Sequence, residues 1–373
     1  MDLQARLSHA VNQVDKLMEK FPEDFPSASS LGLLYGHKPN KEWTAGFFTG
    51  LVWLAYEWTR DEKYRIFAQK HTESFRERLD REVSVDFHDL GFLYTLSCVA
   101  DYKLTGSSFA KETAVMAAER LAARFQSKGG FIQAWGGLDD PEEYRLIIDC
   151  FMNLPLLFWA SEATGVSYFA EAAYKHYHTA VNTVIRKDYT TCHTFFFDKE
   201  TGSLKREATN QGYSDESCWS RGQAWAIYGI PLFLKYCPKE TQEEKKRFFK
   251  VLQVFETLLP EDGIPSWDFY AGEDAGLKDS SAAAIAVCGM QAMLSLYGSG
   301  GEFKKVASLK ERMLRSLLES CDTFAFSKPC DGLLLHGMHH WPRKQGVDES
   351  VLWGDYFYME ALVRESLCWK SYW

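Results

Sequence analysis

The chain has 373 residues, of which 46% are hydrophobic and 25% charged, as in an ordinary soluble protein with a full core. Its formal net charge is −9, and its lysines and arginines are scattered along the sequence, which argues against nucleic acid as a partner. No linker, low-complexity run or break in composition divides the sequence, so we predict a single domain over residues 1–373.

The sequence also indicates a compartment. The N-terminal segment 1–21 is amphipathic and charged, and it lacks the apolar core of a secretory signal. No uncharged apolar run approaches transmembrane length, so we expect no membrane association. The nine cysteines are odd in number and never form a CxxC pair. We therefore expect a reducing compartment, the cytoplasm.

The first predicted element is an amphipathic outer helix over residues 1–20, followed by an irregular loop over residues 21–41. Six apolar helical segments then recur along the chain, each behind a polar or aromatic head. Heads and segments are 43–46 before 47–58, 88–89 before 90–102, 149 and 153 within 145–165, 219–223 before 224–236, 279–281 before 282–297, and 353–355 before 356–367.

This repeat predicts the architecture. Charged amphipathic segments such as 63–79 lie between the apolar ones. Because a repeated unit that cannot bury its own apolar face stacks with its copies, six inner helices should each return through an outer helix. We predict an all-α fold, an (α/α)6 barrel in which the six heads gather at one end of the ring.

Two insertions interrupt the helical pattern. A glycine-rich loop over residues 129–137 matches no phosphate-binding pattern and is expected to present Trp135. Residues 190–207 combine alternating aromatics with a DKETG turn, which predicts a β-hairpin, the one clearly non-helical insertion. A further loop with strand character, residues 331–340, precedes the last head.

The segment 145–165 is apolar on every side of a helical wheel except at its head, where Asp149 and Asn153 lie four residues apart. A helix that is hydrophobic all round is buried in a large protein, and a carboxylate at its mouth is costly to bury without a partner or a task. Helix capping by Asp149 is the alternative explanation. Because such heads recur, we expect them to form a common site.

Several kinds of site find no support in the sequence. The pairs His176/His178 and His339/His340 have no third ligand at a metal-site spacing, so we expect no metal and interpret them as surface or loop histidines. There is no GxSxG elbow and no dinucleotide fingerprint, so we expect neither a serine hydrolase nor a bound cofactor.

The remaining polar and aromatic head residues suit a carbohydrate. Flat sugar faces stack on tryptophan, and glycoside chemistry uses pairs of carboxylates. For each tryptophan, core packing is the alternative. The candidates are Asp89 and Asp149, with Asp279 and Asp355 behind them, the aromatics Trp43, Trp135, Trp219 and Trp225, and the polar residues His88, His193, Gln211 and Arg221.

Seven motifs carry a family resemblance. They are HDLGFLY (88–94), IQAWG (132–136), IIDCFMNLPLL (147–157), CHTFFFD (192–198), CWSRGQAWAIYG (218–229), DSSAAAI (279–285) and WGDYFYMEAL (353–362). In order and spacing, over nearly the whole chain, they resemble the unsaturated glucuronyl hydrolases, glycoside hydrolase family 88. The resemblance implies a cytoplasmic α6/α6-barrel enzyme that acts on unsaturated oligosaccharides left by polysaccharide lyases, which carry a 4-deoxy-4,5-unsaturated glucuronic acid at the non-reducing end.

The resemblance also implies a mechanism: hydration of the C4=C5 vinyl ether, with a proton to C4 and water to C5, after which the hemiketal opens. Asp149 would be the general acid and then the base, and Asp89 would hold sugar hydroxyls and tune Asp149. The resemblance assigns the uronate pocket to His193, Gln211 and Arg221 and its walls to Trp43, Trp135, Trp219 and Trp225.

Physical chemistry adds one expectation about the pKa of Asp149. A vinyl ether needs a proton donor, and two carboxylates in a dry pocket keep a proton because neither ionises easily beside the other. A helix N-terminus would lower the pKa of Asp149. We expect desolvation and Asp89 to outweigh it.

The substrate is less defined. Some relatives that act on sulfated glycosaminoglycans carry a Ser- and Lys-bearing segment before WGDY, whereas this chain has HHWPRKQ (339–345). Arg343 and Lys344 are candidates to meet a sulfate, and two solvated loop cations are the slightly favoured alternative. The preference among chondroitin, hyaluronan, heparin and non-animal uronate oligomers stays open.

Three other functions compete with this one. The nearest is an unsaturated rhamnogalacturonyl hydrolase, which would use the same fold and a similar acid on pectin-lyase products. The others are a glycosidase that displaces directly at the anomeric carbon of saturated chains and a non-catalytic sugar-binding toroid. The expected partner is an unsaturated uronate oligosaccharide, bound by a monomer or weak homo-oligomer.

Overall fold

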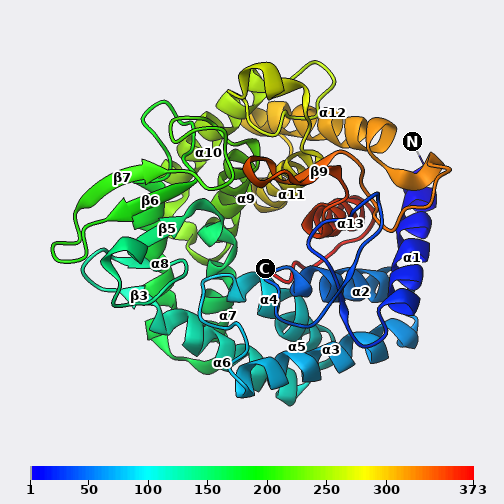
Figure 1. Cartoon of the computed structure of the whole chain (residues 1–373), viewed down its shortest axis with the longest axis horizontal. Coiled ribbons are helices and arrows are strands. Elements are labelled where there is room, and N and C mark those ends of the chain that lie inside the picture. The colour runs from blue at the N-terminus through cyan, green and yellow to red at the C-terminus, as the bar shows by residue number, and fades with distance from the viewer. Residues whose placement is uncertain (1) are drawn as a thin grey trace.

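A computed structural model describes residues 2–373, except for the side chain at position 275. Its helices form two concentric rings, an (α/α)6 barrel (Figure 1). The inner ring consists of α2 (Ala45–Thr59), α4 (Leu90–Tyr94) continued by α5 (Ala100–Thr105), α7 (Leu154–Thr164), α9 (Ser220–Tyr236), α11 (Ser280–Tyr297) and α13 (Leu352–Ser366). The outer ring consists of α1 (Leu3–Lys20), α3 (Glu62–Asp80), α6 (Ser108–Ala123), α8 (Ser167–Val181), α10 (Thr241–Leu258) and α12 (Lys304–Ser320).

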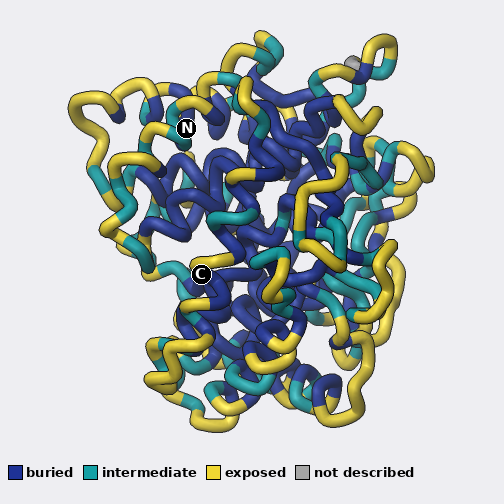
Figure 2. The backbone as a smooth tube through the Cα atoms, turned by 90° about the vertical axis from the view of Figure 1, so that its left-hand side faces the viewer, coloured by how far each residue is buried: buried dark blue, intermediate teal, exposed yellow. Residues whose placement is uncertain are grey.

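The two rings differ in how they are buried, as the hydrophobic pattern predicts. The outer helix α12 buries one stripe, with Val306, Leu309, Met313 and Leu317 at helical spacing. The inner helix α9 is buried continuously from its first residue through Leu234. In Figure 2 the buried inner segments accordingly lie inside a shell of exposed outer loops. The predicted fold class is confirmed.

One inner helix is long and apolar enough to cross a membrane, so the prediction that no apolar run approaches this length was wrong. It is α11, whose 18 residues are 78% buried inside the protein. Since this helix packs between α9 and α13, we interpret it as a core helix of the barrel.

The strands lie in segments that lead from an outer helix to the next inner helix. The predicted hairpin is confirmed as β6 (Thr194–Phe197) and β7 (Leu204–Ala208), and β5 (Arg145–Ile147) joins it in an antiparallel sheet. A second hairpin, β8 (Gly337–His340) with β9 (Gln345–Glu349), confirms the strand character before the last head, so the prediction of a single clear non-helical insertion was wrong. Short antiparallel pairs are β1 (Phe25–Pro26) with β2 (His37–Lys38) and β3 (Phe125–Gln126) with β4 (Phe131–Ile132).

Short helices complete the connections between these elements. A π-helical turn, Thr95–Val99, joins α4 to α5. The 3-10 helices are Pro141–Glu143, Ile148–Met152, Pro238–Glu240, Gly272–Gly276, Gly301–Phe303, Thr323–Ala325 and Trp341–Arg343.

The prediction of one continuous helix over residues 145–165 was wrong in its first half. Residues 145–147 pair with β6, residues 148–152 form a 3-10 turn, and α7 begins only at Leu154. Asn153, not Asp149, is the N-cap residue, and its side chain makes no capping hydrogen bond. Because Pro155 has no backbone N–H, it is best accommodated in the first turn of a helix, which helps to place the boundary here. Capping therefore does not explain Asp149.

Candidate active site

Three head residues converge where the predicted inner helices two and three begin. His88 and Asp89 directly precede α4, and Asp149 lies in the 3-10 turn before α7. The Nε2 atom of His88 is 3.3 Å from Oδ1 of Asp89 and 3.4 Å from Oδ1 of Asp149. All three atoms lie within 4.8 Å of one another. Two carboxyl groups separated by 60 residues of sequence thus share one small site.

A glycine allows the two carboxylates to approach each other. A Cβ atom at Gly91 would lie 2.3 Å from the Cα atom of Asn153, closer than side-chain carbons come to backbone. Oδ1 of Asn153 accepts a hydrogen bond from the backbone N–H of Phe92 at 3.1 Å. The beginnings of α4 and α7 are therefore in direct contact, and each carries its carboxylate to the same point.

Burial decides the protonation of this pair. It raises the pKa of Asp149 to about 7, whereas the positive charge of Arg221 opposes the rise. It also raises the pKa of Asp89 well above its ordinary value; the negative charge of Asp149 adds to this rise and the Asn153 side chain opposes it. Two carboxyl groups this close cannot both ionise readily, so the pair retains a proton up to neutral pH. Burial also lowers the pKa of His88 well below its usual range, so His88 is neutral.

Buried polar atoms without partners surround the pair. Within the described residues, hydrogen bonds are missing for Nδ1 and Nε2 of His88, for Oδ1 of Asp89 and of Asp149, and for Nε2 of His193. Native proteins pair nearly all such atoms, so a cluster of unpaired ones marks a place where a polar ligand binds. The Asp89 and Asp149 side chains keep 12% and 16% of their surface exposed, which leaves the ligand a way in.

Arg221, in the first turn of α9, is held on every side. Its Nη1 atom donates to the carboxylate of Asp279 and, at 2.6 Å, to the carbonyl of Met338. Its Nη2 atom donates to Oε1 of Gln211 at 2.7 Å and to the carbonyl of His339 at 2.9 Å. These bonds tie α9 to α11, to β8 and to the loop after β7. Arg221 therefore supplies a fixed positive charge beside Asp149.

Aromatic rings frame this charge and the carboxyl pair. The guanidinium of Arg221 lies 4.4 Å from the ring of Trp219 and 5.0 Å from that of Trp353. Trp43 stacks on Trp353, with ring centroids 5.2 Å apart. The ring of His193 lies 5.1 Å from Trp219.

The two other predicted tryptophans differ in their surroundings. Trp135 meets the His88 ring edge-on, with centroids 6.3 Å apart. Trp225 is 1% exposed and packs against Phe92 and Phe357, as its core-packing alternative requires. Its place in the wall of the site stays a prediction.

A pocket of about 510 Å³ is rich in arginine, and it is connected to the site through Trp135, whose ring also meets that of His88. Arg145 from β5, Arg206 from β7 and Arg343 line it, together with Trp135. Sequence reasoning found Arg343 but missed the other two. Lys344 is not among the lining residues, and its ammonium lies over the ring of Trp341.

Comparison with known proteins identifies the family. The family model described as Glycosyl Hydrolase Family 88 matches residues 13–322 of this chain. This chain belongs to glycoside hydrolase family 88. It is 43% identical to the unsaturated chondroitin disaccharide hydrolase of Streptococcus pneumoniae, over 98% of this chain and 92% of that protein.

Solved structures of family 88 relatives have the same fold. The unsaturated glucuronyl hydrolase of Streptococcus agalactiae matches with a TM-score of 0.92 and 41% identity, over 99% of this chain and 94% of that one. The unsaturated glucuronyl hydrolase of Bacillus sp. GL1, described as responsible for the degradation of glycosaminoglycan, matches with a TM-score of 0.93 and 36% identity, over 97% and 96%.

The sequence indicates surface or loop positions for four histidines. For several of them the structure shows that this interpretation was wrong. His176 is fully buried on α8, and its Nδ1 atom accepts the backbone N–H of Ile132. His340 is 6% exposed in β8. His339 lies beside the site, with its ring 5.2 Å from that of Trp353. Single histidines in apolar or strand segments gave no signal of these contacts.

Although we expected no metal site, three residues of the site are arranged as metal ligands could be. His88, Asp89 and Asp149 offer nitrogen and oxygen atoms close enough together to hold a cation. The same atoms also suit a shared proton, because the fixed charge of Arg221 lies beside them and disfavours a second positive ion. We therefore interpret the cluster as a proton-transfer site.

Proposed function

We propose that this glycoside hydrolase releases 4-deoxy-4,5-unsaturated glucuronic acid from the non-reducing end of lyase-generated glycosaminoglycan oligosaccharides. The buried Asp89–Asp149 pair, which keeps a proton up to neutral pH, is the observation that carries the proposal. An electron-rich vinyl ether needs such a donor. The relatives named as unsaturated chondroitin disaccharide and glucuronyl hydrolases, at 43% and 37% identity, support the same substrate class.

In the proposed reaction Asp149 gives its proton to C4, and the positive charge that develops is shared between C5 and the ring oxygen. The Asp149 carboxylate then takes a proton from a water molecule while the water oxygen bonds to C5. The resulting hemiketal opens, and the bond to the next sugar breaks. Arg221 favours the ionised intermediate state of Asp149 because its charge stabilises the carboxylate.

The surrounding residues take binding roles in this proposal. Asp89 accepts hydrogen bonds from sugar hydroxyls, and its proximity to Asp149 disfavours ionisation of both carboxyl groups together. His88 and His193, whose buried ring nitrogens lack partners, bind the unsaturated sugar together with Gln211. Trp43, Trp135, Trp219 and Trp225 form the walls, as aromatic rings do for flat sugar faces.

The arginine-lined pocket is proposed to hold the next sugar and its negative groups. Arg145, Arg206 and Arg343 offer planar donors that match sulfate and carboxylate oxygens. A variant of the Streptococcus agalactiae enzyme has been crystallised with dGlcA-GalNAc6S, a 6-sulfated chondroitin disaccharide unit. We therefore propose sulfated chondroitin disaccharides as the first substrates to test.

The alternatives carry less support. The relatives found are glucuronyl and chondroitin-disaccharide hydrolases, which does not favour the unsaturated rhamnogalacturonyl activity. We propose that the enzyme works in the cytoplasm, as a monomer or weak homo-oligomer, without a cofactor, metal, membrane or nucleic acid. The odd number of cysteines without a CxxC pair supports that compartment.

The deciding experiment follows the ultraviolet absorbance of the conjugated double bond during incubation with an unsaturated chondroitin disaccharide. We expect the absorbance to disappear with wild-type enzyme and to persist with Asp149→Asn. A saturated disaccharide and a pectin-lyase product serve as competing substrates. Cleavage of the saturated disaccharide without loss of the unsaturated one would show direct displacement instead, and preference for the pectin-lyase product would favour the rhamnogalacturonyl activity.

A further inference from the structure

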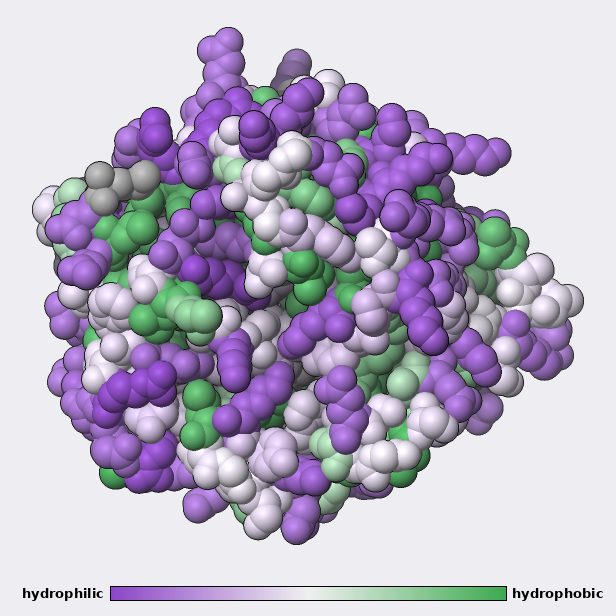
Figure 3. Space-filling model, turned by 180° about the vertical axis from the view of Figure 1, so that it is seen from behind, coloured by the Kyte–Doolittle hydropathy of each residue, from purple (hydrophilic) through white to green (hydrophobic). Residues whose placement is uncertain are grey.

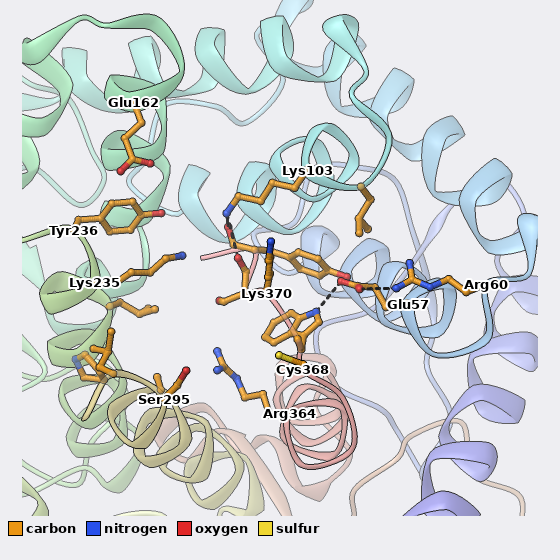
Figure 4. Close-up of a pocket in the computed structure, with 18 residues that line it drawn as sticks. Glu57, Arg60, Lys103, Glu162, Lys235, Tyr236, Ser295, Arg364, Cys368 and Lys370 are labelled. Carbon is orange, nitrogen blue, oxygen red and sulfur yellow. Dashed lines mark hydrogen bonds and ion pairs between the residues drawn. The ribbon is translucent and has the colours of Figure 1, made fainter. Parts of the chain in front are cut away.

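A second cavity opens at the end of the barrel opposite to the carboxyl pair. Its volume is about 760 Å³, within the range of small-molecule sites. The last turns of all six inner helices surround it (Figure 4), represented in helix order by Glu57, Lys103, Glu162, Lys235, Ser295 and Arg364. The C-terminal segment 368–372 forms the remaining side.

Positive side chains outnumber negative ones in this rear cavity. Five cations line it, against the two carboxylates Glu57 and Glu162, in a chain whose net charge is −9. Arg364 also pairs with the buried Glu360 at 2.9 Å, so the excess positive charge lies on the three lysines. Glu57 is already engaged, since it accepts from the indole N–H of Trp369 at 2.8 Å and pairs with Arg60 at 3.5 Å. Figure 4 shows the head groups of Lys235, Lys370 and Arg364 turned toward the middle of the cavity.

The two deepest lysines are charged at a cost. Lys103 donates to the carbonyls of Ser371 and Tyr372 at 3.2 and 2.6 Å, and Lys235 donates to the terminal carboxylate of Trp373. Burial, with a smaller contribution from the charge of Lys235, lowers the pKa of Lys103 to about 7, and the charge of Glu162 opposes this shift. Burial also lowers the pKa of Lys235 to about 8, with Arg364 adding to the effect. The neutral carbonyls that Lys103 contacts therefore do not balance its positive charge.

Helix dipoles explain part of this charge but not all of it. The C-terminal ends of the inner helices carry partial negative charge, which favours nearby cations. Lys370, however, lies outside any helix, and among the described residues its ammonium has no hydrogen bond or ion pair. Since helix dipoles act only over the last turn, this lysine needs another reason to face the cavity.

We propose that the rear cavity is a second, non-catalytic binding site for a small organic anion that carries a carboxylate, sulfate or phosphate group. The ammonium groups of Lys103, Lys235 and Lys370 bind the negative group. Tyr236, Trp369 and the apolar side chain of Leu232 offer flat or apolar surface for a ring such as a sugar. Sulfated and phosphorylated sugars share this chemistry. The surrounding surface, seen from behind in Figure 3, is mostly hydrophilic.

The test is isothermal titration of the whole protein with N-acetylgalactosamine 6-sulfate, glucose 6-phosphate and inorganic phosphate. Lys370→Glu reverses one charge on an exposed residue and should weaken binding about tenfold, the effect of roughly 1.4 kcal/mol. The matched control is Lys175→Glu, on the exposed side of α8, which should leave binding unchanged. Tighter binding of N-acetylgalactosamine 6-sulfate would identify the ligand as a sulfated sugar, and tighter binding of glucose 6-phosphate would identify it as a phosphorylated sugar.

Two further measurements separate this site from the catalytic one. Lys370→Glu should leave turnover of the unsaturated disaccharide unchanged, which also shows that the variant is folded. Because the arginine-lined pocket is itself proposed to bind a sulfate, the titrations are repeated with Arg343→Gln, and the part of the binding that Lys370→Glu weakens should remain in that variant. The affinity for N-acetylgalactosamine 6-sulfate, whose sulfate keeps its charge, should fall from about pH 6 to about pH 9 as Lys103 and Lys235 lose their protons.

The proposal fails if none of the three probes binds saturably, if binding is insensitive to Lys370→Glu, or if Lys175→Glu weakens it equally. Should Lys370→Glu not fold, Arg60→Glu replaces it, because the Arg60 side chain is 63% exposed and lines the same cavity. Failure of anion binding would leave the proposed hydrolase activity intact, since the activity assay uses the other end of the barrel.

Discussion

The four carboxylates at the heads of inner helices form two contrasting pairs. Asp279 and Asp355 are fully buried and saturated with donors. Asp279 accepts from Arg221 and from the N–H and O–H of Ser281, and Asp355 accepts from the hydroxyl of Tyr35 and from two backbone N–H groups of residues 333 and 334. Asp89 and Asp149 each have one oxygen atom without a partner among the described residues.

This difference shows what distinguishes a structural head from a chemical one. Burial raises the pKa of Asp355 to about 7, as it does for Asp149, so a raised pKa alone does not separate the two pairs. The two pairs differ instead in how many hydrogen-bond donors each carboxylate has. A saturated carboxylate fixes loops to the barrel, whereas an unsaturated one beside a second carboxyl group is free to accept and give a proton.

The largest expected effect comes from Asp149→Asn. It should lower kcat on an unsaturated chondroitin disaccharide about a thousandfold, because amides cannot exchange the proton that the reaction needs. Asp355→Asn is the matched control: its oxygen still accepts the two backbone N–H groups, so turnover should stay within about tenfold of wild type. Equal losses in both variants would mean that the two pairs do not differ in function.

Stability should show the reverse order. Asp355→Ala leaves two buried backbone N–H groups and the Tyr35 hydroxyl without their acceptor, which should cost about 3 kcal/mol of unfolding free energy. Asp149→Ala removes a carboxyl group whose Oδ1 has no partner to lose and should cost less than about 1 kcal/mol. Urea denaturation of both variants measures the difference. A larger loss for Asp149→Ala would contradict the assignment of Asp355 as the structural head.

The sequence predicts the barrel because each inner segment is apolar on all sides and each outer one on a single stripe, a signal that is local. The beginning of α7 was misplaced because a short apolar run such as residues 146–148 fits a strand as well as a helix. Residues 145–147 form a strand because they pair with β6, which lies some 50 residues further along the chain. That pairing cannot be read from local periodicity.

The candidate site was also predicted only in part. Sequence motifs brought out both carboxylates, His88 and Arg221, which the structure brings together. Arg145 and Arg206 were missed because they become neighbours only through the sheet, in which both lie opposite Phe196. The single-domain organisation of residues 1–373 and the catalytic and binding role of each site residue stay predictions.

A pH dependence of stability sharpens the same contrast. The folded-state pKa of Asp149 is about 7, above an unfolded value of about 4, so the native state keeps a proton that the unfolded state has lost. Stability therefore falls as pH rises from about 4 through about 7. Asp149→Asn should raise the unfolding free energy by at least about 2 kcal/mol at pH 8 and change it little at pH 4.

The control for this measurement is Asp139→Asn, because the side chain of Asp139 is fully exposed. It should give no gain that depends on pH. Urea denaturation at both pH values provides the numbers. If Asp149→Asn gained as much at pH 4 as at pH 8, ionisation of Asp149 would not be the cause.

The smallest expected effect extends the comparison of free and occupied groups to two neighbouring cations. The Arg343 side chain lines the arginine-rich pocket and has no hydrogen bond or ion pair within the described part of the chain, whereas Lys344 is occupied by the ring of Trp341. Arg343→Gln should raise KM for a 6-sulfated unsaturated disaccharide about threefold, the value of one partly solvated ion pair, and leave kcat unchanged. Lys344→Gln should change neither. Since an unsulfated disaccharide offers Arg343 no sulfate, the variant should treat it as wild type does, and an equal rise in KM for both substrates would show that Arg343 does not contact the sulfate.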